Sequence, residues 1–231
     1  MSKYITLLAL ACVAAYGSAV YWPEFYFKNR REYGNFVIVS RSGVPPSAEK
    51  FVERASYRIS KSELFRPGQK FEIYAADSPR QYAVFAPFCR GGYACIHPFK
   101  NMSFMAPADF ERGVVASVKN PLKTASLENT MVHEAVKLQI RAMVRPLAYI
   151  SMADWKKEGY GQYVAASDSD LQPSDICSPD AETNPDRSAY LYRLVMEYML
   201  NEEKTSLQYI LTTEVSPEAA IRTVKARYCG Q

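Results

Sequence analysis

The longest hydrophobic pattern outside the N-terminus lies between residues 128 and 166, and its spacing predicts two helices. Apolar positions cover most of the surface of the first: Met131, Val132, Ala135, Val136, Leu138, Ile140 and Met143. A helix that is apolar on most sides is normally buried. The same helix carries His133, Glu134 and Lys137 in its middle, and burying such groups is unfavourable unless each has a partner. We therefore expect the three to interact with other polar groups.

The spacing of these residues suggests a specific chemistry. His133 and Lys137 are four residues apart and share a helix face, and Glu134 lies roughly 100° round from His133 at about 3.6 residues per turn. The zinc-protease pattern H-E-x-x-H has this layout, with two imidazoles on one metal and the Glu as general base. A third ligand then comes from a second helix, where Glu158 is placed to serve.

The second helix carries the run W-K-K-E-G-Y-G-Q-Y-V from Trp155 to Val164. With His133 and Glu134, this run resembles the gluzincin-type (peptidase MA-like) zinc metallopeptidases, whose second motif is W-x-x-E-G-x-A-x-Y-V. The resemblance is to the bacterial, membrane-anchored branch of hypothetical proteins. It covers nearly the whole chain, but only His133-Glu134 and Glu158-Gly159 are specific within it.

The resemblance implies a zincin-like fold, with a sheet lobe before the zinc helix and a helical lobe after it. It also implies that an edge strand just before the zinc helix binds the substrate backbone. Residues 93–96 and 101–105 are both candidates for this strand. A tyrosine near the start of a later helix lies close to the active cleft in the family, and Tyr190 matches it, with a role in stabilising the oxyanion if the protein is active.

The sequence departs from the family at Lys137, which stands where the second zinc histidine is expected. A lysine ammonium has three donors and no lone pair, so it cannot bind zinc unless deprotonated. His133 and Glu158 then remain as two protein ligands, whereas catalytic zinc normally has three. The simplest interpretation is that Lys137 takes the place of the metal and pairs with Glu158, and with Glu134 as a second partner.

We therefore expect a metallopeptidase-like protein that has lost zinc and activity and acts in binding or scaffolding at the cell envelope, with a peptide or protein in its cleft. The alternative is an active zinc peptidase, in which His133 and Glu158 bind the metal and Glu134 is the general base. A structural envelope protein without a cleft function is a third interpretation. Zinc is expected as a cofactor only in the active case.

The remaining pattern predicts an α+β protein, with a small N-terminal mixed sheet lobe followed by a helical lobe. Strands are predicted at 35–40, 70–75, 82–85, 93–96 and 101–105, and helices at 47–61, 187–201, 206–213 and 217–228. We divide the chain into an anchor or signal segment (1–22), an aromatic and basic connector (23–34) and one domain (35–231). Its sheet lobe spans about 35–120 and its helical lobe about 121–231, including a polar loop at 168–185.

The N-terminal segment indicates the compartment. Residues 4–22 form an uncharged run of 19 residues, long enough to span a bilayer at about 1.5 Å per residue, and it ends in Tyr21-Trp22. Cleavage after the small residues Gly17, Ser18 and Ala19 is the rival interpretation, in which the protein is secreted. The chain therefore has the membrane as a partner through residues 4–22 unless this segment is removed.

Charge and cysteines give opposite indications of topology. Basic residues follow the apolar run in larger number than they precede it, which the positive-inside rule associates with a cytoplasmic domain. Cys89, Cys95, Cys177 and Cys229 instead suit two disulfides in an oxidising compartment. Cys89 and Cys95 are spaced to close a short loop, which leaves Cys177 to reach Cys229. We expect a periplasmic or extracellular domain.

Composition excludes one class of function. Of the 231 residues, 48% are hydrophobic and 23% are charged, which is ordinary for a globular protein with a sizeable core. The net charge is only +4, the Lys and Arg residues are scattered, and no basic stripe with interleaved aromatic residues is present. Nucleic acid is therefore not an expected partner.

Overall fold

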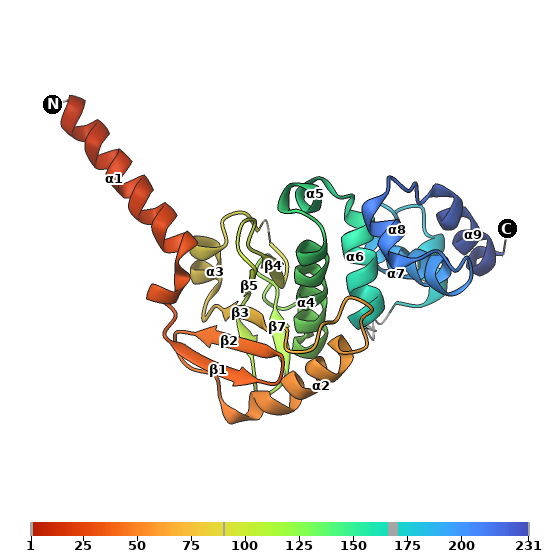
Figure 1. The fold of residues 1–231 in the computed structure, drawn as a ribbon, viewed down its shortest axis with the longest axis horizontal. Coiled ribbons are helices and arrows are strands. Elements are labelled where there is room, and N and C mark those ends of the chain that lie inside the picture. Colours follow the sequence, from red (N-terminus) through yellow and green to blue (C-terminus); the bar gives the residue numbers. More distant parts are fainter. Residues whose placement is uncertain (1, 90, 166–170, 231) are drawn as a thin grey trace. The chain divides into compact units, whose positions relative to one another are not determined.

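The computed structural model describes residues 2–89, 91–165 and 171–230 of the chain. It has a mixed α+β fold, which confirms the predicted class (Figure 1). The chain forms two compact units, each described below by itself. Unit 1 comprises Met1–Glu53 and Lys70–Thr130, and unit 2 comprises Arg54–Gln69 and Met131–Gln231. The helical unit thus includes a segment from within the predicted sheet lobe.

The main sheet of unit 1 has five strands in the order β1-β2-β3-β5-β4. Their bounds are β1 Asn29–Tyr33, β2 Phe36–Ser40, β3 Phe71–Ala75, β4 Ala94–Ile96 and β5 Met102–Met105. The central pairs β2–β3 and β3–β5 are parallel, whereas β1 and β4 join antiparallel at the two edges. Every residue of β2 and β5 is buried, as expected for continuous apolar strands inside a sheet.

Two predictions for this region were wrong. The connector at 23–34 contains strand β1, whose polar sequence N-R-R-E-Y suits an exposed edge and lacks the hydrophobic alternation of a half-buried strand. Residues 82–85 were predicted as a strand and instead end helix α3 (Pro79–Phe85). The Ser78 side chain accepts a hydrogen bond from the Gln81 backbone N–H, and Pro79 opens the first turn, which together define a helix start.

A second sheet in unit 1 has three short antiparallel strands: β6 (Ala108–Asp109), β7 (Val114–Ala116) and β8 (Thr124–Ser126). None of the three was predicted, because each is too short to show a periodic pattern. The β6–β7 turn lies against helix α2 (Glu49–Ile59), which begins after a short 3-10 turn at Pro46–Ala48. A Cβ atom placed on Gly113 would overlap the Phe51 ring.

The N-terminal helix α1 (Ser2–Tyr21) leads into a 3-10 turn, η1 (Pro23–Phe25), and projects away from the rest of unit 1 (Figure 1). Tyr4–Tyr21 has a mean hydropathy of 1.7 and is long and apolar enough to cross a membrane. A signal sequence would have the same properties. By length and composition alone, the segment meets the criteria for an anchor and those for a signal sequence.

Unit 2 is helical. Its elements are α4 (Leu127–Met143, which begins in unit 1), α5 (Pro146–Ser151), α6 (Asp154–Ala165), η3 (Pro173–Cys177), α7 (Pro185–Asn201), α8 (Leu207–Thr212) and α9 (Glu218–Cys229). The polar loop predicted at 168–185 therefore contains the short helix η3, while its residues 168–170 lie outside the described part. Among the elements that the structure describes, α6 and α7 share the most extensive contact.

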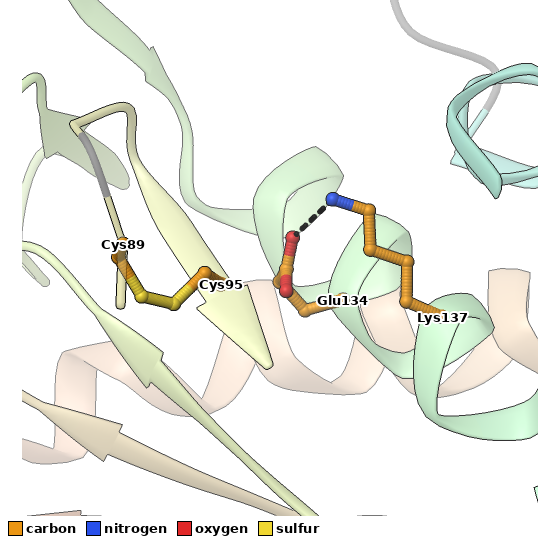
Figure 2. Close-up of a disulfide and its surroundings, with 4 residues drawn as sticks. All are labelled: Cys89, Cys95, Glu134 and Lys137. Carbon is orange, nitrogen blue, oxygen red and sulfur yellow. Dashed lines mark hydrogen bonds and ion pairs between the residues drawn. A yellow bond between two sulfur atoms is a disulfide. The ribbon is translucent and has the colours of Figure 1, made fainter. Parts of the chain in front are cut away.

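Each unit contains one disulfide. In unit 1 Cys89 is bonded to Cys95, with their Cα atoms 6.1 Å apart (Figure 2). In unit 2 Cys177 is bonded to Cys229, with a Cα–Cα distance of 5.5 Å, and this bond joins the end of η3 to the end of α9. These are the pairs that the spacing of the four cysteines suggested. Cys12 on α1 is an exposed free cysteine.

Candidate functional site

The candidate site is a cluster of charged side chains on α4 and α6 of unit 2. The apolar residues of α4 from Leu127 to Ile140 are buried, which explains why this helix is hydrophobic on most of its surface. His133, Glu134 and Lys137 lie in its middle with side chains that are 14%, 3% and 13% exposed. The fourth member, Glu158, comes from the second turn of α6 and is one-third exposed.

Lys137 lies between two carboxylates. Its Nζ atom is 2.9 Å from Glu158 Oε1 and 3.2 Å from Glu134 Oε1. Figure 2 shows the ammonium directed at the Glu134 carboxylate one turn earlier on the same helix. Both carboxylates that the sequence analysis named as partners of Lys137 are therefore in contact with it.

His133 forms the other side of the cluster. Its Nε2 atom is 3.0 Å from Glu158 Oε2, and its Nδ1 atom is 3.4 Å from Glu134 Oε1. The approach of Nε2 is close enough for an ion pair, but its direction is not that of a hydrogen bond. Within the described residues Nε2 of His133 and Oε2 of Glu134 have no hydrogen-bond partner. The cluster is thus charge-paired, with two buried polar atoms that still lack a hydrogen bond.

The electrostatics of the cluster favour the charged form of every member. Burial and the Lys137 ammonium lower the pKa of His133, but the Glu158 and Glu134 carboxylates outweigh them, so that pKa is raised. Burial alone would raise the pKa values of Glu134 and Glu158, yet Lys137 and His133 hold both below the usual range.

The pKa of Lys137 is also shifted towards its charged form. Burial lowers the pKa of Lys137, but Glu134 and Glu158 outweigh this effect and raise it above its ordinary value. The lysine therefore keeps its proton over the physiological pH range. In the form in which His133 also carries a proton, its imidazolium and the Lys137 ammonium balance the Glu134 and Glu158 carboxylates.

This donor set does not fit a catalytic zinc ion. The family resemblance implies three protein ligands, but only His133 and Glu158 have lone pairs at the required positions. The third position is filled by the ammonium of Lys137, which has none. Among the described residues no group of three or more His, Cys, Asp or Glu side chains is arranged to hold a metal.

Two glycines bring α6 close to its neighbours. A Cβ atom on Gly161 would lie 2.7 Å from His133 Nε2, so the absence of a side chain leaves room for the imidazole. The family motif has Ala at this position, and Gly161 is therefore a second departure from it. A Cβ atom on Gly159 would lie 2.7 Å from the backbone oxygen of Tyr192, which explains how α6 packs so closely on α7.

The tyrosine beside the cluster is Tyr149 of α5, which the sequence analysis missed. Burial raises the pKa of Tyr149, with Lys137 acting against the shift and Glu134 adding to it. A signal was available, because Tyr149 lies on the short connection between the two motif helices. Tyr190, the predicted candidate, instead has Arg193 near its ring. Burial raises its pKa, and none of the charged groups that modify the shift belongs to the cluster.

A second polar cluster in unit 2 contains no charged side chain. The Ser62 hydroxyl donates to Gln139 Oε1 of α4 at 2.7 Å and lies 3.0 Å from the hydroxyl of Tyr160 on α6. The Tyr160 hydroxyl also accepts a hydrogen bond from the backbone N–H of Glu63 at 3.1 Å. This neutral cluster holds the segment after α2 to both motif helices.

Comparison with known proteins adds no further identification. No protein-family model matches the chain, and no curated protein sequence matches it.

Proposed function

We propose that the protein is a membrane-anchored, metallopeptidase-like protein that does not hydrolyse peptides and acts in binding or scaffolding at the cell envelope. The observation that carries the proposal is the position of Lys137, with its ammonium 2.9 Å from the Glu158 carboxylate. A tethered cation occupies the place that a gluzincin gives to zinc. The zincin-like fold is part of this proposal.

The chemistry of the cluster supports a binding role over catalysis. A general base must be free to take a proton. The Glu134 side chain is only 3% exposed to solvent and is paired with Lys137. The depressed pKa of Glu134 makes it a weaker base as well. The arrangement therefore offers no metal-activated water and no available base.

The edge of the main sheet supports peptide binding as the retained activity. Of the two candidate strands, β4 is at the edge and β5 is between β3 and β4. The His97 N–H donates to the Met102 carbonyl, and the Tyr93 carbonyl accepts from the Ala106 N–H, so the backbone groups of Tyr93 and His97 point towards β5. The backbone N–H and C=O groups of Ala94 and Ile96 therefore point away from β5. An extended peptide can add to these groups as a further strand.

Cell-envelope localisation is supported by α1 and by the two disulfides. α1 has the length and hydropathy of a membrane span, and disulfides persist in oxidising compartments. We infer that α1 anchors the chain and that the remaining residues lie on the periplasmic or extracellular side.

Metal analysis tests the loss of zinc. We expect the purified protein, dialysed against trace zinc, to contain none in stoichiometric amount by elemental analysis. Lys137→His should raise zinc affinity, because it restores an imidazole lone pair at the third position. Lys137→Gln is the matched control, since it removes the charge without adding an imidazole. Stoichiometric zinc in the wild-type protein that is lost in Glu158→Ala would instead establish an active metal site.

Peptide binding can be tested at the sheet edge. Ala94→Pro removes one outward N–H and leaves the hydrogen bonds to β5 in place, whereas Ala94→Val keeps the N–H. On an array of extended peptides we expect binding by the wild type and by Ala94→Val, and loss of binding by Ala94→Pro. Equal binding by all three proteins would contradict strand addition at β4.

A further inference from the structure

A group of aromatic side chains is exposed where α1 meets the rest of unit 1. Phe25 of η1 and Phe99 in the loop between β4 and β5 are 78% and 68% exposed, and Trp22 and Tyr26 are exposed beside them. Large aromatic residues are normally buried, so an exposed group of them indicates a surface with a partner. These residues belong neither to the charged cluster on α4 and α6 nor to the β4 edge.

The contacts of α1 hold this aromatic group at one end of the helix. The Tyr16 hydroxyl donates to the backbone oxygen of Val84 in α3 at 2.8 Å. The Tyr21 ring packs edge-on against His97 at 6.0 Å, and Lys100 Nζ lies 4.6 Å from the centre of the Tyr21 ring. The loop bearing Phe99 is therefore fixed beside the last turn of α1. The exposed aromatic group therefore lies near the end of α1 at which the proposed span leaves the bilayer.

Basic side chains extend the same surface. Two adjacent hollows, of about 670 and 590 Å³, share Lys28 and Arg30 in their walls. The first also includes Lys100 and two acidic residues, and the second includes Arg31 and no acidic residue. The hollows therefore have an excess of positive charge.

The two acidic residues of the first hollow are already paired. Arg30 contacts Glu72 at 2.6 Å, and Lys100 lies 3.7 Å from Glu24. In the part of the chain that the structure describes, neither Lys28 nor Arg31 forms an ion pair. Two exposed cations thus remain available to an external anion: Lys28, which follows the exposed aromatic residues closely in the chain, and Arg31 in the wall of the second hollow.

We propose that this surface, formed by Trp22, Phe25, Tyr26, Phe99, Lys28 and Arg31, rests on a bilayer that contains anionic lipids. Aromatic side chains favour the interface between hydrocarbon and headgroups, and basic residues near a span are attracted to anionic headgroups. The headgroup phosphates would lie at Lys28 and Arg31. The proposal rests on the anchoring role of α1 in the proposed function, and it adds a second contact that orients unit 1 on the membrane.

This assignment also accounts for the opposite topology signals in the sequence. Positive residues after a span normally indicate a cytoplasmic position, whereas the two disulfides indicate an oxidising compartment. If the basic residues of the connector bind lipid headgroups, this contact explains why they follow the span. Their presence is then compatible with an exported domain.

Lipid quenching tests the contact on the full chain. Cys12→Ser removes the free thiol, and Phe99→Cys then supplies one site for a fluorophore without reduction of the disulfides. The matched site is Glu111→Cys in the exposed β6–β7 turn, which lies against α2. The protein is reconstituted into vesicles of phosphatidylcholine with phosphatidylglycerol and a nitroxide-bearing lipid. We expect the label at position 99 to be quenched and the label at position 111 to remain bright.

Charge reversal tests the role of the cations. Lys28→Glu with Arg31→Glu should abolish most of the quenching at position 99 in these vesicles. Lys50→Glu with Arg112→Glu changes the net charge equally at α2 and the β6–β7 turn, and should leave the quenching intact. Equal quenching at positions 99 and 111, or an equal response to the two charge reversals, would overturn the proposal.

Retention of the protein in vesicles after an alkaline wash reports anchoring by α1 separately. Protein that is retained but unquenched at position 99 overturns the lipid contact alone. Protein that is released overturns the anchor and the lipid contact together, while the zinc measurement on the cluster is unaffected. A label shielded from both the nitroxide lipid and aqueous iodide shows that another protein surface covers position 99, and it also overturns the proposal.

Discussion

Helices α4 and α6 are linked by two polar clusters of opposite character. One is charged and joins Lys137 of α4 to Glu158 of α6. The other is neutral and joins Gln139 of α4 to Tyr160 of α6 through Ser62. Lys137 and Gln139 are only two positions apart on α4, and Glu158 and Tyr160 are only two positions apart on α6. The same pair of helices thus allows a direct comparison of charged and neutral groups in similar surroundings.

The comparison indicates which cluster serves the stability of the fold. Neutral hydrogen bonds each contribute about 0.5–1.5 kcal/mol to stability, and they are an ordinary means of holding a loop to helices. Burying ions costs several kcal/mol per ion, so apolar residues of similar size often give equal or greater stability. The charged cluster is therefore not explained by stability alone. The function proposed above accounts for the cluster as a metal position taken over by a lysine.

The largest expected effect comes from breaking the charged cluster. Lys137→Met removes the ammonium and leaves the Glu134 and Glu158 carboxylates without their main partner. Removing one member of a buried ion pair costs about 3–5 kcal/mol, and we expect a loss of this size in the free energy of unfolding in urea.

The matched control is Lys225→Met in the same unit. Lys225 pairs with Glu182 at the surface, where an ion pair contributes about 0–1 kcal/mol. A similar small loss for both variants would show that the charged cluster is solvated, and it would remove the contrast with the neutral cluster.

The sequence predicted the members of the charged cluster better than their surroundings. His133, Glu134 and Lys137 are close in the chain, and the spacing of one helix determines which of them share a face. Glu158 followed from the family motif. Tyr149 was missed although it lies on the short connection between the two motif helices. Gly161 was missed because its role depends on how closely α6 approaches α4, which the pattern of a single helix does not encode.

For the fold, long apolar patterns were informative and short or polar elements were not. The predicted helices at 187–201, 206–213 and 217–228 correspond to α7, α8 and α9. Strand β1 was missed because an exposed edge strand has no buried face to produce alternation. At residues 82–85 the apolar content predicts a strand, whereas the Ser78-Pro79 start favours the helix that the structure has.

A smaller effect is expected in the neutral cluster. Tyr160→Phe removes a buried hydroxyl that contacts Ser62 and accepts from the Glu63 N–H, and leaving such groups unsatisfied costs about 1–3 kcal/mol. We expect a loss near the lower end of this range, measured by urea unfolding. Tyr163→Phe is the control, because the hydroxyl of Tyr163 makes an exposed contact of 3.4 Å with Asn201. Equal losses would show that the neutral cluster contributes no more than a surface contact.

The smallest expected effect is a dependence of stability on pH that only the charged cluster should show. The pKa of His133 is raised, so its contribution is complete below its unfolded value of about 6.5 and is lost as pH rises through the folded value. Burial and Lys137 act against the attraction to the carboxylates and so limit this contribution. In the neutral cluster burial raises the pKa of Tyr160 to about 12, far from this range. We therefore expect the free energy of unfolding to fall above about pH 6.5, a fall that His133→Gln abolishes and His97→Gln leaves in place. An unchanged slope in His133→Gln would mean that His133 is not held protonated, and that Lys137 is the only cation of the cluster facing the two carboxylates.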